Sequence, residues 1–143
     1  MAEPSGLRIL HVDDVEINLL VLDDMLSMLG HRPVPATSGA EAFTLMETSS
    51  FDLVLTDFHM PDVTGLDFLK NVKALREPAR STPVVVVTAD VMSFTNAGLR
   101  EMGFAGALAK PITANALRKV IAAAFDGAEP FIGDGFARAA SGA

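Results

Sequence analysis

Five short apolar runs alternate with segments of helical periodicity along most of this 143-residue chain. Such an alternation predicts an α/β protein with a doubly wound, five-stranded parallel sheet and helices on both of its faces. The second run is only Val34 between two prolines, which cannot donate to a neighbouring strand, so this strand is expected at an edge. The strand order 2-1-3-4-5 places it there. The expected strands are 8–12, the residues around Val34, 51–56, 84–88 and 107–109.

The segments between these runs carry helix signals. In the first, five apolar residues recur at intervals of four and three over Val15–Leu29, and Gly30 follows as a stop. Ser38-Gly-Ala-Glu41 is a capping box at the start of the second helix, and Thr113 can cap the last one. The two helices between these are expected over 65–76 and 93–102.

Composition and charge exclude several classes of protein. Eleven basic and eighteen acidic residues give a net charge of −7, which opposes binding to nucleic acid or to an anionic membrane surface. Without cysteine there is no disulfide, no thiolate zinc site and no cysteine nucleophile. No apolar run approaches the roughly 18–20 residues of a spanning helix, and residues 1–6 do not have the pattern of a signal peptide. We expect a soluble cytoplasmic protein.

The length predicts one domain, over residues 6–126. Residues 127–143 contain four Gly and five Ala without a sustained period, and we expect them to form a loose tail. Phe131, Ile132 and Phe136 are the apolar residues available to attach part of this tail to the domain.

Polar and charged residues stand where four of the expected strands end. In sheets of this kind, ligands bind beyond the carboxyl ends of the strands, where the strand order reverses. The sequence therefore predicts that three carboxylates, a hydroxyl and an ammonium group converge at one edge of the sheet. These residues are Asp13 and Asp14 after the first strand, Asp57 after the third, Thr88 at the end of the fourth and Lys110-Pro111 after the fifth.

Three neighbouring carboxylates repel one another unless a cation offsets their charge. Mg2+ prefers oxygen ligands, and its sites combine one or two carboxylates with a phosphate. We therefore predict Mg2+ as the cofactor and phosphoryl transfer as the chemistry, with one carboxylate as nucleophile and a lysine and a hydroxyl at the phosphoryl oxygens. Asp57 is the best candidate nucleophile, because it stands alone at the end of the central strand.

These residues closely resemble the receiver domain of two-component response regulators, from about Leu7 to Phe125. The stretch 12–18 further resembles receivers of hybrid histidine kinases and of single-domain regulators. The motifs arrive in the order and at the spacing of that family. They are Leu10-His-Val-Asp-Asp14, Asp57-Phe-His-Met-Pro-Asp-Val-Thr-Gly-Leu66, Val87-Thr-Ala89 and Ala109-Lys-Pro-Ile112.

The resemblance implies a flavodoxin-like receiver fold and a phospho-accepting switch rather than an enzyme. The implied partner is a histidine kinase or a histidine phosphotransfer protein, which presents a phosphohistidine on a helical bundle. The implied phosphoacceptor is Asp57. The implied Mg2+ site has Asp14, Asp57 and the backbone carbonyl of His59 as ligands, with Asp13 holding a metal-bound water. Thr88 and Lys110 are implied to contact the phosphoryl group, and the peptide bond before Pro111 is implied to be cis.

One position departs from the family pattern. Receivers usually place Tyr or Phe three residues before the lysine, where this chain has Ala107, and Phe104 is nearby but out of register. Three alternatives stay open on the residues alone: a flavodoxin-like flavin protein, a haloacid-dehalogenase-type Mg2+-dependent phosphatase, and a degenerate receiver that serves only as an interaction module. Asp13-Asp14 would repel a flavin phosphate, and the phosphatase class wants a second acid where this chain has His59.

The first expected helix has apolar residues on two faces. Placed at about 100° per residue, Val15 and the residues in phase with it form the buried stripe, and Ile17 and Leu20 lie roughly opposite. Either the last helix or an oligomer contact covers these two residues, or they form an exposed docking patch beside Asp13-Asp14. We predict that Ile17 and Leu20 contact the partner.

Overall fold

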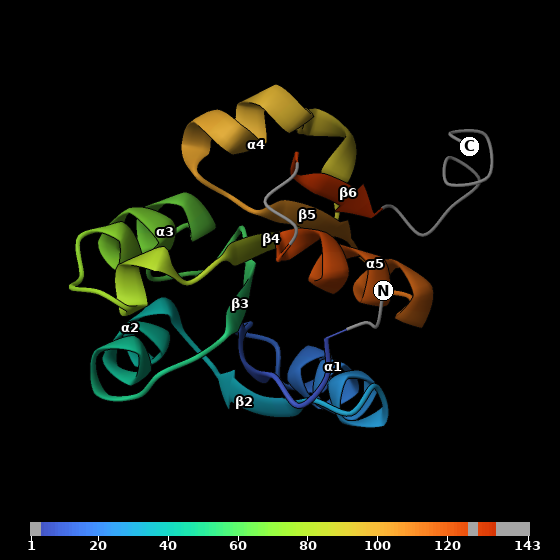
Figure 1. Ribbon diagram of the computed structural model, residues 1–143, viewed down its shortest axis with the longest axis horizontal. Coiled ribbons are helices and arrows are strands. Elements are labelled where there is room, and N and C mark those ends of the chain that lie inside the picture. The colour runs from blue at the N-terminus through green and yellow to red at the C-terminus, as the bar shows by residue number, and fades with distance from the viewer. Residues whose placement is uncertain (1–3, 126–128, 134–143) are drawn as a thin grey trace.

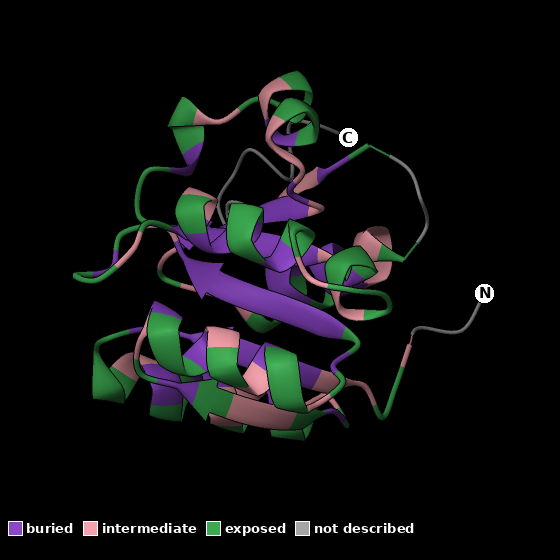
Figure 2. Cartoon of the chain, turned by 90° about the vertical axis from the view of Figure 1, so that its left-hand side faces the viewer, coloured by how far each residue is buried: buried purple, intermediate pink, exposed green. Residues whose placement is uncertain are grey.

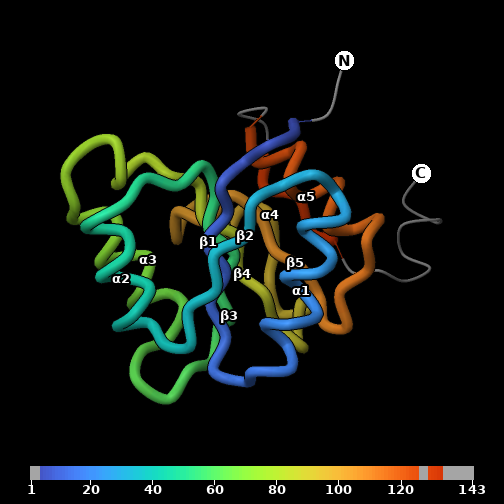
Figure 3. The backbone as a smooth tube through the Cα atoms, turned by 90° about the horizontal axis from the view of Figure 1, so that it is seen from below, coloured from blue at the N-terminus to red at the C-terminus, as the bar shows by residue number. Residues whose placement is uncertain are grey.

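The computed structural model of the protein describes residues 4–125 and 129–133. A parallel sheet lies between two layers of helices, with α2, α3 and α4 on one face and α1 and α5 on the other (Figures 1 and 3). The strands are β1 (Arg8–Val12), β2 (Arg32–Ala36), β3 (Leu53–Asp57), β4 (Val84–Thr88), β5 (Gly106–Ala109) and β6 (Phe131–Gly133). The helices are α1 (Glu16–Met28), α2 (Gly39–Thr48), α3 (Gly65–Lys73), α4 (Asn96–Met102) and α5 (Ala114–Ala124), with short 3-10 helices at Ala79–Ser81 and Val91–Ser93.

The strand order is β2-β1-β3-β4-β5-β6, and every pair of neighbours is parallel. The predicted α/β class and the order 2-1-3-4-5 are therefore confirmed. The proline-flanked strand β2 lies at one edge, as the missing N–H donors of Pro33 and Pro35 require.

The predicted number of strands is wrong, because β6 adds a sixth strand beside β5. It falls within the range expected to be a loose tail, and it contains Phe131 and Ile132, two of the apolar residues expected to attach that range. Three residues are too few to show a strand period, so the sequence pattern does not reveal this strand. Phe136 lies outside the described residues.

Helix α3 ends at Lys73 instead of 76, and β5 begins at Gly106 instead of 107. Two further element boundaries differ from the prediction for local reasons. Phe51 is buried but precedes β3, and the Arg8 guanidinium lies over its ring at 4.7 Å. The apolar side chain of Phe51 therefore indicates a buried position, but Phe51 is not part of the strand. The fourth helix begins at Asn96 instead of 93, because Thr95 is extended and its side chain caps the helix by accepting the N–H of Gly98.

Each face of the sheet has its own hydrophobic core, and the central strands are buried on both sides (Figure 2). Along β4, Val84 and Val86 pack toward α2, α3 and α4, whereas Val85 and Val87 pack toward α1 and α5. This alternation explains why β4 is an unbroken apolar run.

Helix α1 buries only part of its predicted stripe. Leu19, Leu22 and Leu26 are buried, in agreement with the helical period. The prediction that Val15 belongs to the buried face is wrong, because Val15 is the extended residue before the helix and 44% of it is exposed. None of the helices in the described residues combines the length and apolar character that crossing a membrane requires.

Candidate functional site

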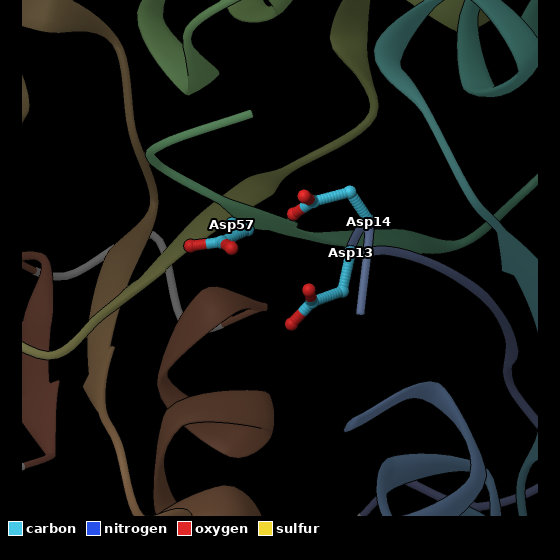
Figure 4. A group of neighbouring side chains, drawn as sticks. All are labelled: Asp13, Asp14 and Asp57. Carbon is cyan, nitrogen blue, oxygen red and sulfur yellow. The ribbon is translucent and has the colours of Figure 1, made fainter. Parts of the chain in front are cut away.

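Three carboxylates meet where β1 and β3 end, at the reversal of strand order (Figure 4). Asp13 and Asp14 directly follow β1, and Asp57 is the last residue of β3. One oxygen from each of them lies within 4.8 Å of the others. Asp13 and Asp57 are buried and Asp14 is exposed, so the cluster opens to solvent on the Asp14 side.

Lys110 brings a positive charge to this cluster. Its Nζ donates to Oδ2 of Asp57 at 3.2 Å and to Oδ2 of Asp13 at 3.3 Å. Lys110 follows β5, and its backbone N–H bonds to the carbonyl of Thr88, which ties β5 to β4 at this edge. The Lys110–Pro111 peptide bond is cis.

The Asp13 side chain also fixes the start of α1. Its Oδ1 accepts the backbone N–H of Val15 at 2.9 Å, and its Oδ2 accepts Nδ2 of Asn18 at 3.1 Å. The sequence alone does not predict a site role for Asn18. The available signal was its spacing, since a polar side chain in the first turn of a helix can face the residues just before that helix.

Burial and the positive charge of Lys110 have opposite effects on the pKa of Asp57. Burial raises the pKa of the Asp57 carboxyl, the charge of Asp13 adds to this rise, and the Lys110 ammonium only partly offsets it. Burial on its own would lower the pKa of Lys110, but the carboxylates of Asp57 and Asp13 outweigh burial and raise that pKa. The lysine is therefore charged at neutral pH, and the Asp57 carboxylate is more basic than an exposed one.

Thr88 stands beside Asp57 at the end of the next strand. Asp57 pairs with Val87 across β3 and β4, and Thr88 is the following residue. The Thr88 side chain is buried, and its Oγ1 accepts the backbone N–H of Asp90 at 3.1 Å. In β5, Ala107 is fully buried, and Phe104 is buried on the α4 side of the sheet.

The loop from Phe58 to Thr64 connects Asp57 to α3 and contains His59, whose side chain is exposed. The Asp62 carboxylate fastens this loop to the start of α2, accepting the N–H of Ala40 at 2.9 Å and that of Gly39 at 3.3 Å. Burial opposes ionisation of Asp62, but these N–H groups prevail and lower its pKa. No local sequence pattern indicates these contacts, because they join residues 22 and 23 positions apart.

The donor set suits a hard divalent cation. The clustered ligand atoms are carboxylate oxygens, which Mg2+ prefers, and the cluster contains no sulfur or nitrogen ligand. Three carboxylates against one lysine leave negative charge for a cation to neutralise. The arrangement thus combines a basic carboxylate, a neighbouring ammonium and a cation site, which are the groups that phosphoryl transfer uses.

Comparison with known proteins gives the class to which this fold and site belong. Residues 9–122 match the family described as the response regulator receiver domain. The chain therefore belongs to the receiver domain family, whose members are generally phospho-accepting signalling domains rather than enzymes.

Within the family, the chain is similar to receivers of hybrid sensor kinases. It is 34% identical over 122 residues to the sensory/regulatory protein RpfC of Xanthomonas campestris, a match that covers 85% of this chain and 17% of that protein. It is 32% identical over 120 residues to the aerobic respiration control sensor protein ArcB of Escherichia coli K12, with coverage of 81% and 15%. The chain therefore spans less than a fifth of the length of either relative.

Solved receivers have the same architecture. The receiver domain of the sensor histidine kinase PA1611 from Pseudomonas aeruginosa superposes with a TM-score of 0.72 at 27% identity, covering 82% of this chain and 95% of that one. That crystal structure has a magnesium ion coordinated in its active-site cleft. The chemotaxis response regulator CheY4 of Vibrio cholerae superposes with a TM-score of 0.75 at 24% identity, covering 85% and 100%, which shows the shared fold.

Proposed function

We propose that Asp57 accepts a phosphoryl group from a phosphohistidine and that the chain thereby switches its interactions with partners. The observation that carries this proposal is the convergence of Asp13, Asp14, Asp57 and Lys110 at one edge of the sheet. Family membership and the similarity to receivers of hybrid sensor kinases support it. The partner is then a histidine kinase or a histidine phosphotransfer protein.

In the transfer step, an oxygen of the Asp57 carboxylate attacks the phosphorus atom of the phosphohistidine. The new O–P bond replaces the P–N bond, and the electron pair of the broken bond returns to the imidazole nitrogen. The ionised carboxylate of Asp57 is the nucleophile, and in the metal-free chain burial raises the pKa of this carboxyl while Lys110 partly offsets the rise.

Lys110 and Thr88 then act on the phosphoryl oxygens. Lys110 already lies 3.2 Å from Asp57 Oδ2, so its ammonium can follow the negative charge onto the phosphoryl group. The Thr88 hydroxyl can donate to a phosphoryl oxygen from the neighbouring strand end. Asp13, Asp14, Asp57 and the carbonyl of His59 would hold Mg2+, which when bound neutralises phosphoryl charge.

The proposed partner docks on the first turns of α1. Ile17 and Leu20 are 61% and 57% exposed, so α5 does not cover them. They are close in sequence to Asn18, whose side chain bonds Asp13 in the site. A largely apolar cavity of about 190 Å³ opens next to this surface, lined by Val21 and Met25 of α1 and by Ile112 after β5. An apolar helix face laid here would bring its phosphohistidine toward Asp57.

Intact-mass spectrometry tests the phosphoacceptor. After treatment with acetyl phosphate and Mg2+, the wild-type chain should gain one phosphoryl group, and the adduct should be labile. Asp57→Asn should abolish the gain, and Asp24→Asn, an exposed carboxylate on α1, should leave it intact. An undiminished mass gain in Asp57→Asn would disprove the assignment.

Two phosphodonors separate docking from chemistry. Ile17→Glu and Leu20→Glu should block transfer from the cognate histidine protein and leave phosphorylation by acetyl phosphate unchanged, because the small donor needs only the site. Met28→Glu, at an 86% exposed position near the other end of α1, is the matched control. If a variant loses phosphorylation by acetyl phosphate as well as by the histidine protein, or if either variant unfolds, the docking assignment is wrong.

A further inference from the structure

The outer edge of β5 is occupied by residues 129–133. Strand β6 runs parallel to β5, with Gly106 opposite Phe131, Ala107 opposite Ile132 and Leu108 opposite Gly133. Figure 1 shows β6 outside β5, between α4 and α5. The sheet of this receiver therefore does not end at β5, whose edge pairs with a segment later in the same chain.

Small residues in β5 allow this close approach. A Cβ atom on Gly106 would lie 2.9 Å from the carbonyl oxygen of Phe131 and 2.9 Å from Val120 Cγ2, so a side chain at this position would push β6 outward. The next residue is Ala107, fully buried and directly opposite Ile132. The small side chain of Ala107 is thus buried where β5 pairs with Ile132 of β6.

The segment packs against both faces of the sheet. Ile132 contacts the core on the side of α2, α3 and α4, and Phe131 contacts the core on the side of α1 and α5. Pro130 is buried. Residues 129–133 therefore form a strap over the β5 edge, and the surface beneath it consists of that edge with its flanking helices.

Two polar contacts join the strap to α4. Nδ2 of Asn96 donates to the carbonyl of Pro130 at 2.8 Å, and Arg100 pairs with Glu129. Helix α4 follows the residues after Thr88, whose Oγ1 accepts the N–H of Asp90. The chain therefore runs from the strand end beside Asp57, through residues 90–95, directly into the helix that holds the strap.

We propose that residues 129–133 are an intramolecular ligand of a strand-binding surface formed by the β5 edge and α4, and that phosphorylation of Asp57 releases them. The release rests on the function proposed above. When the Thr88 hydroxyl turns to a phosphoryl oxygen, the N–H of Asp90 loses its acceptor and the start of α4 is free to shift. A three-residue strand has few ladder hydrogen bonds, so losing the Asn96 and Arg100 contacts leaves it held only by that short ladder and by the packing of Pro130, Phe131 and Ile132. The vacated edge can then take another extended segment.

Hydrogen exchange followed by mass spectrometry tests the strap in the full chain, without metal or phosphodonor. Asn96→Ala should raise amide exchange several-fold in peptides covering 129–133 and 106–109, with α3 unchanged. Asn115→Ala, an exposed asparagine in the first turn of α5, is the matched control and should change neither peptide. Ile132→Asp should reproduce the effect from the strap side. If both Asn96→Ala and Ile132→Asp leave these peptides unchanged, the strap is not held as proposed.

The same measurement with Mg2+ and beryllofluoride, a phosphoryl mimic, tests release. Exchange at 129–133 should rise several-fold in the wild type and stay unchanged in Asp57→Asn. If beryllofluoride changes amide exchange at 88–95 but not at 129–133, phosphorylation does not release the strap. If neither segment responds, nor the loop after Asp57, the phosphoacceptor function itself fails and the release fails with it. The exchange measurements on Asn96→Ala and Ile132→Asp without metal then still test whether the strap covers the β5 edge.

Discussion

Asp57 carries its charge in a place where burial makes that charge unfavourable. Its side chain is 10% exposed, and burial raises its pKa even though Lys110 lies 3.2 Å away. Because the folded state binds this proton more tightly than the unfolded chain, ionisation of Asp57 destabilises the fold at any pH above the folded pKa. The proposed nucleophile is therefore kept at a cost in stability, as is common at functional sites.

Asp57→Asn should consequently stabilise the metal-free domain at pH 7.5. The substitution removes the buried charge and leaves Lys110 paired with Asp13. A gain of about 1 kcal/mol would raise the Tm by about 3–5 °C for a domain of this size. Differential scanning calorimetry measures the change, with Asp24→Asn as the exposed control, and a lower Tm for Asp57→Asn would contradict the argument.

Lys110→Ala should keep Mg2+ binding and weaken the conformational response to a phosphoryl group. The lysine is a charge beside two carboxylates and not a core residue, so the fold and Mg2+ binding should persist. Binding should tighten, because the variant removes a positive charge from the cation site. The response to beryllofluoride should weaken. Calorimetric titration with Mg2+ and hydrogen exchange at 88–95 check both effects, and a wild-type exchange response would show that the assigned role is wrong.

The buried His31 makes stability depend on pH. Burial lowers its pKa, and its Nδ1 accepts the N–H of Leu7 at 3.2 Å, so the folded state favours the neutral ring. Below about pH 6.5 the unfolded chain binds more protons, and the free energy of unfolding falls as the pH drops toward the folded pKa. His31→Asn, whose side-chain oxygen can accept the same N–H, should lose less stability between pH 7.5 and 5.5. Urea unfolding at both pH values measures this, and equal losses in the two proteins would refute it.

At the level of elements, the loops after the strands are held by the helices beside them. The capping prediction at α2 is confirmed for Ser38, which accepts the N–H of Glu41, whereas the Glu41 carboxylate reaches back to the N–H of Thr37. Asp62 supplies a second cap to the same helix from the loop after Asp57. The N-terminus of α2 thus positions the loop that contains His59.

Asp62→Ala should destabilise the domain by about 1 kcal/mol, a typical value for losing a helix cap. Asp62→Asn should cost less, since an amide oxygen can still accept one N–H. Both variants should also weaken Mg2+ binding, because they free the loop after Asp57. Chemical unfolding and calorimetric titration measure the two effects, with Asp24→Ala as the control. Unchanged stability in Asp62→Ala would exclude the capping role.

For the molecule as a whole, the net charge of −7 is concentrated in part at one edge of the sheet, where three carboxylates cluster. A divalent cation held at this edge would bind only the folded chain, because the carboxylates after β1 and β3 come together only when the sheet forms. Binding and folding are therefore linked by mass action.

Mg2+ should raise the Tm, and at a concentration of about 100 times its Kd the gain is about 2.7 kcal/mol. Asp14→Asn should remove most of this gain, since it deletes the proposed ligand on the solvent side of the cluster. Thermal unfolding with and without Mg2+ measures the gain, with NaCl of equal ionic strength as the control. A rise of the same size in NaCl would mean general screening and not a metal site.

Much of the fold was predictable because its signals are local. The unbroken apolar run at 84–88, the prolines around Val34 and the spacing of Leu19, Leu22 and Leu26 indicate a buried strand, an edge strand and a helix face without any distant contact. Strand order then followed, and with it the meeting of Asp13, Asp14, Asp57 and Lys110, because parallel strands end at the same edge.

Long-range contacts and short elements, which no sequence periodicity indicates, were decided only by the tertiary structure. The contacts of Asp62 with Ala40 and of Asn96 with Pro130 join residues 22 and 34 positions apart, and no local pattern encodes such pairs. Strand β6 has three residues, and it is a strand because β5 supplies a paired edge and the helices supply apolar surface. Periodicity along the chain sets which residues can form elements, whereas long-range packing sets which short segments gain enough contacts to offset the entropy lost when they become ordered.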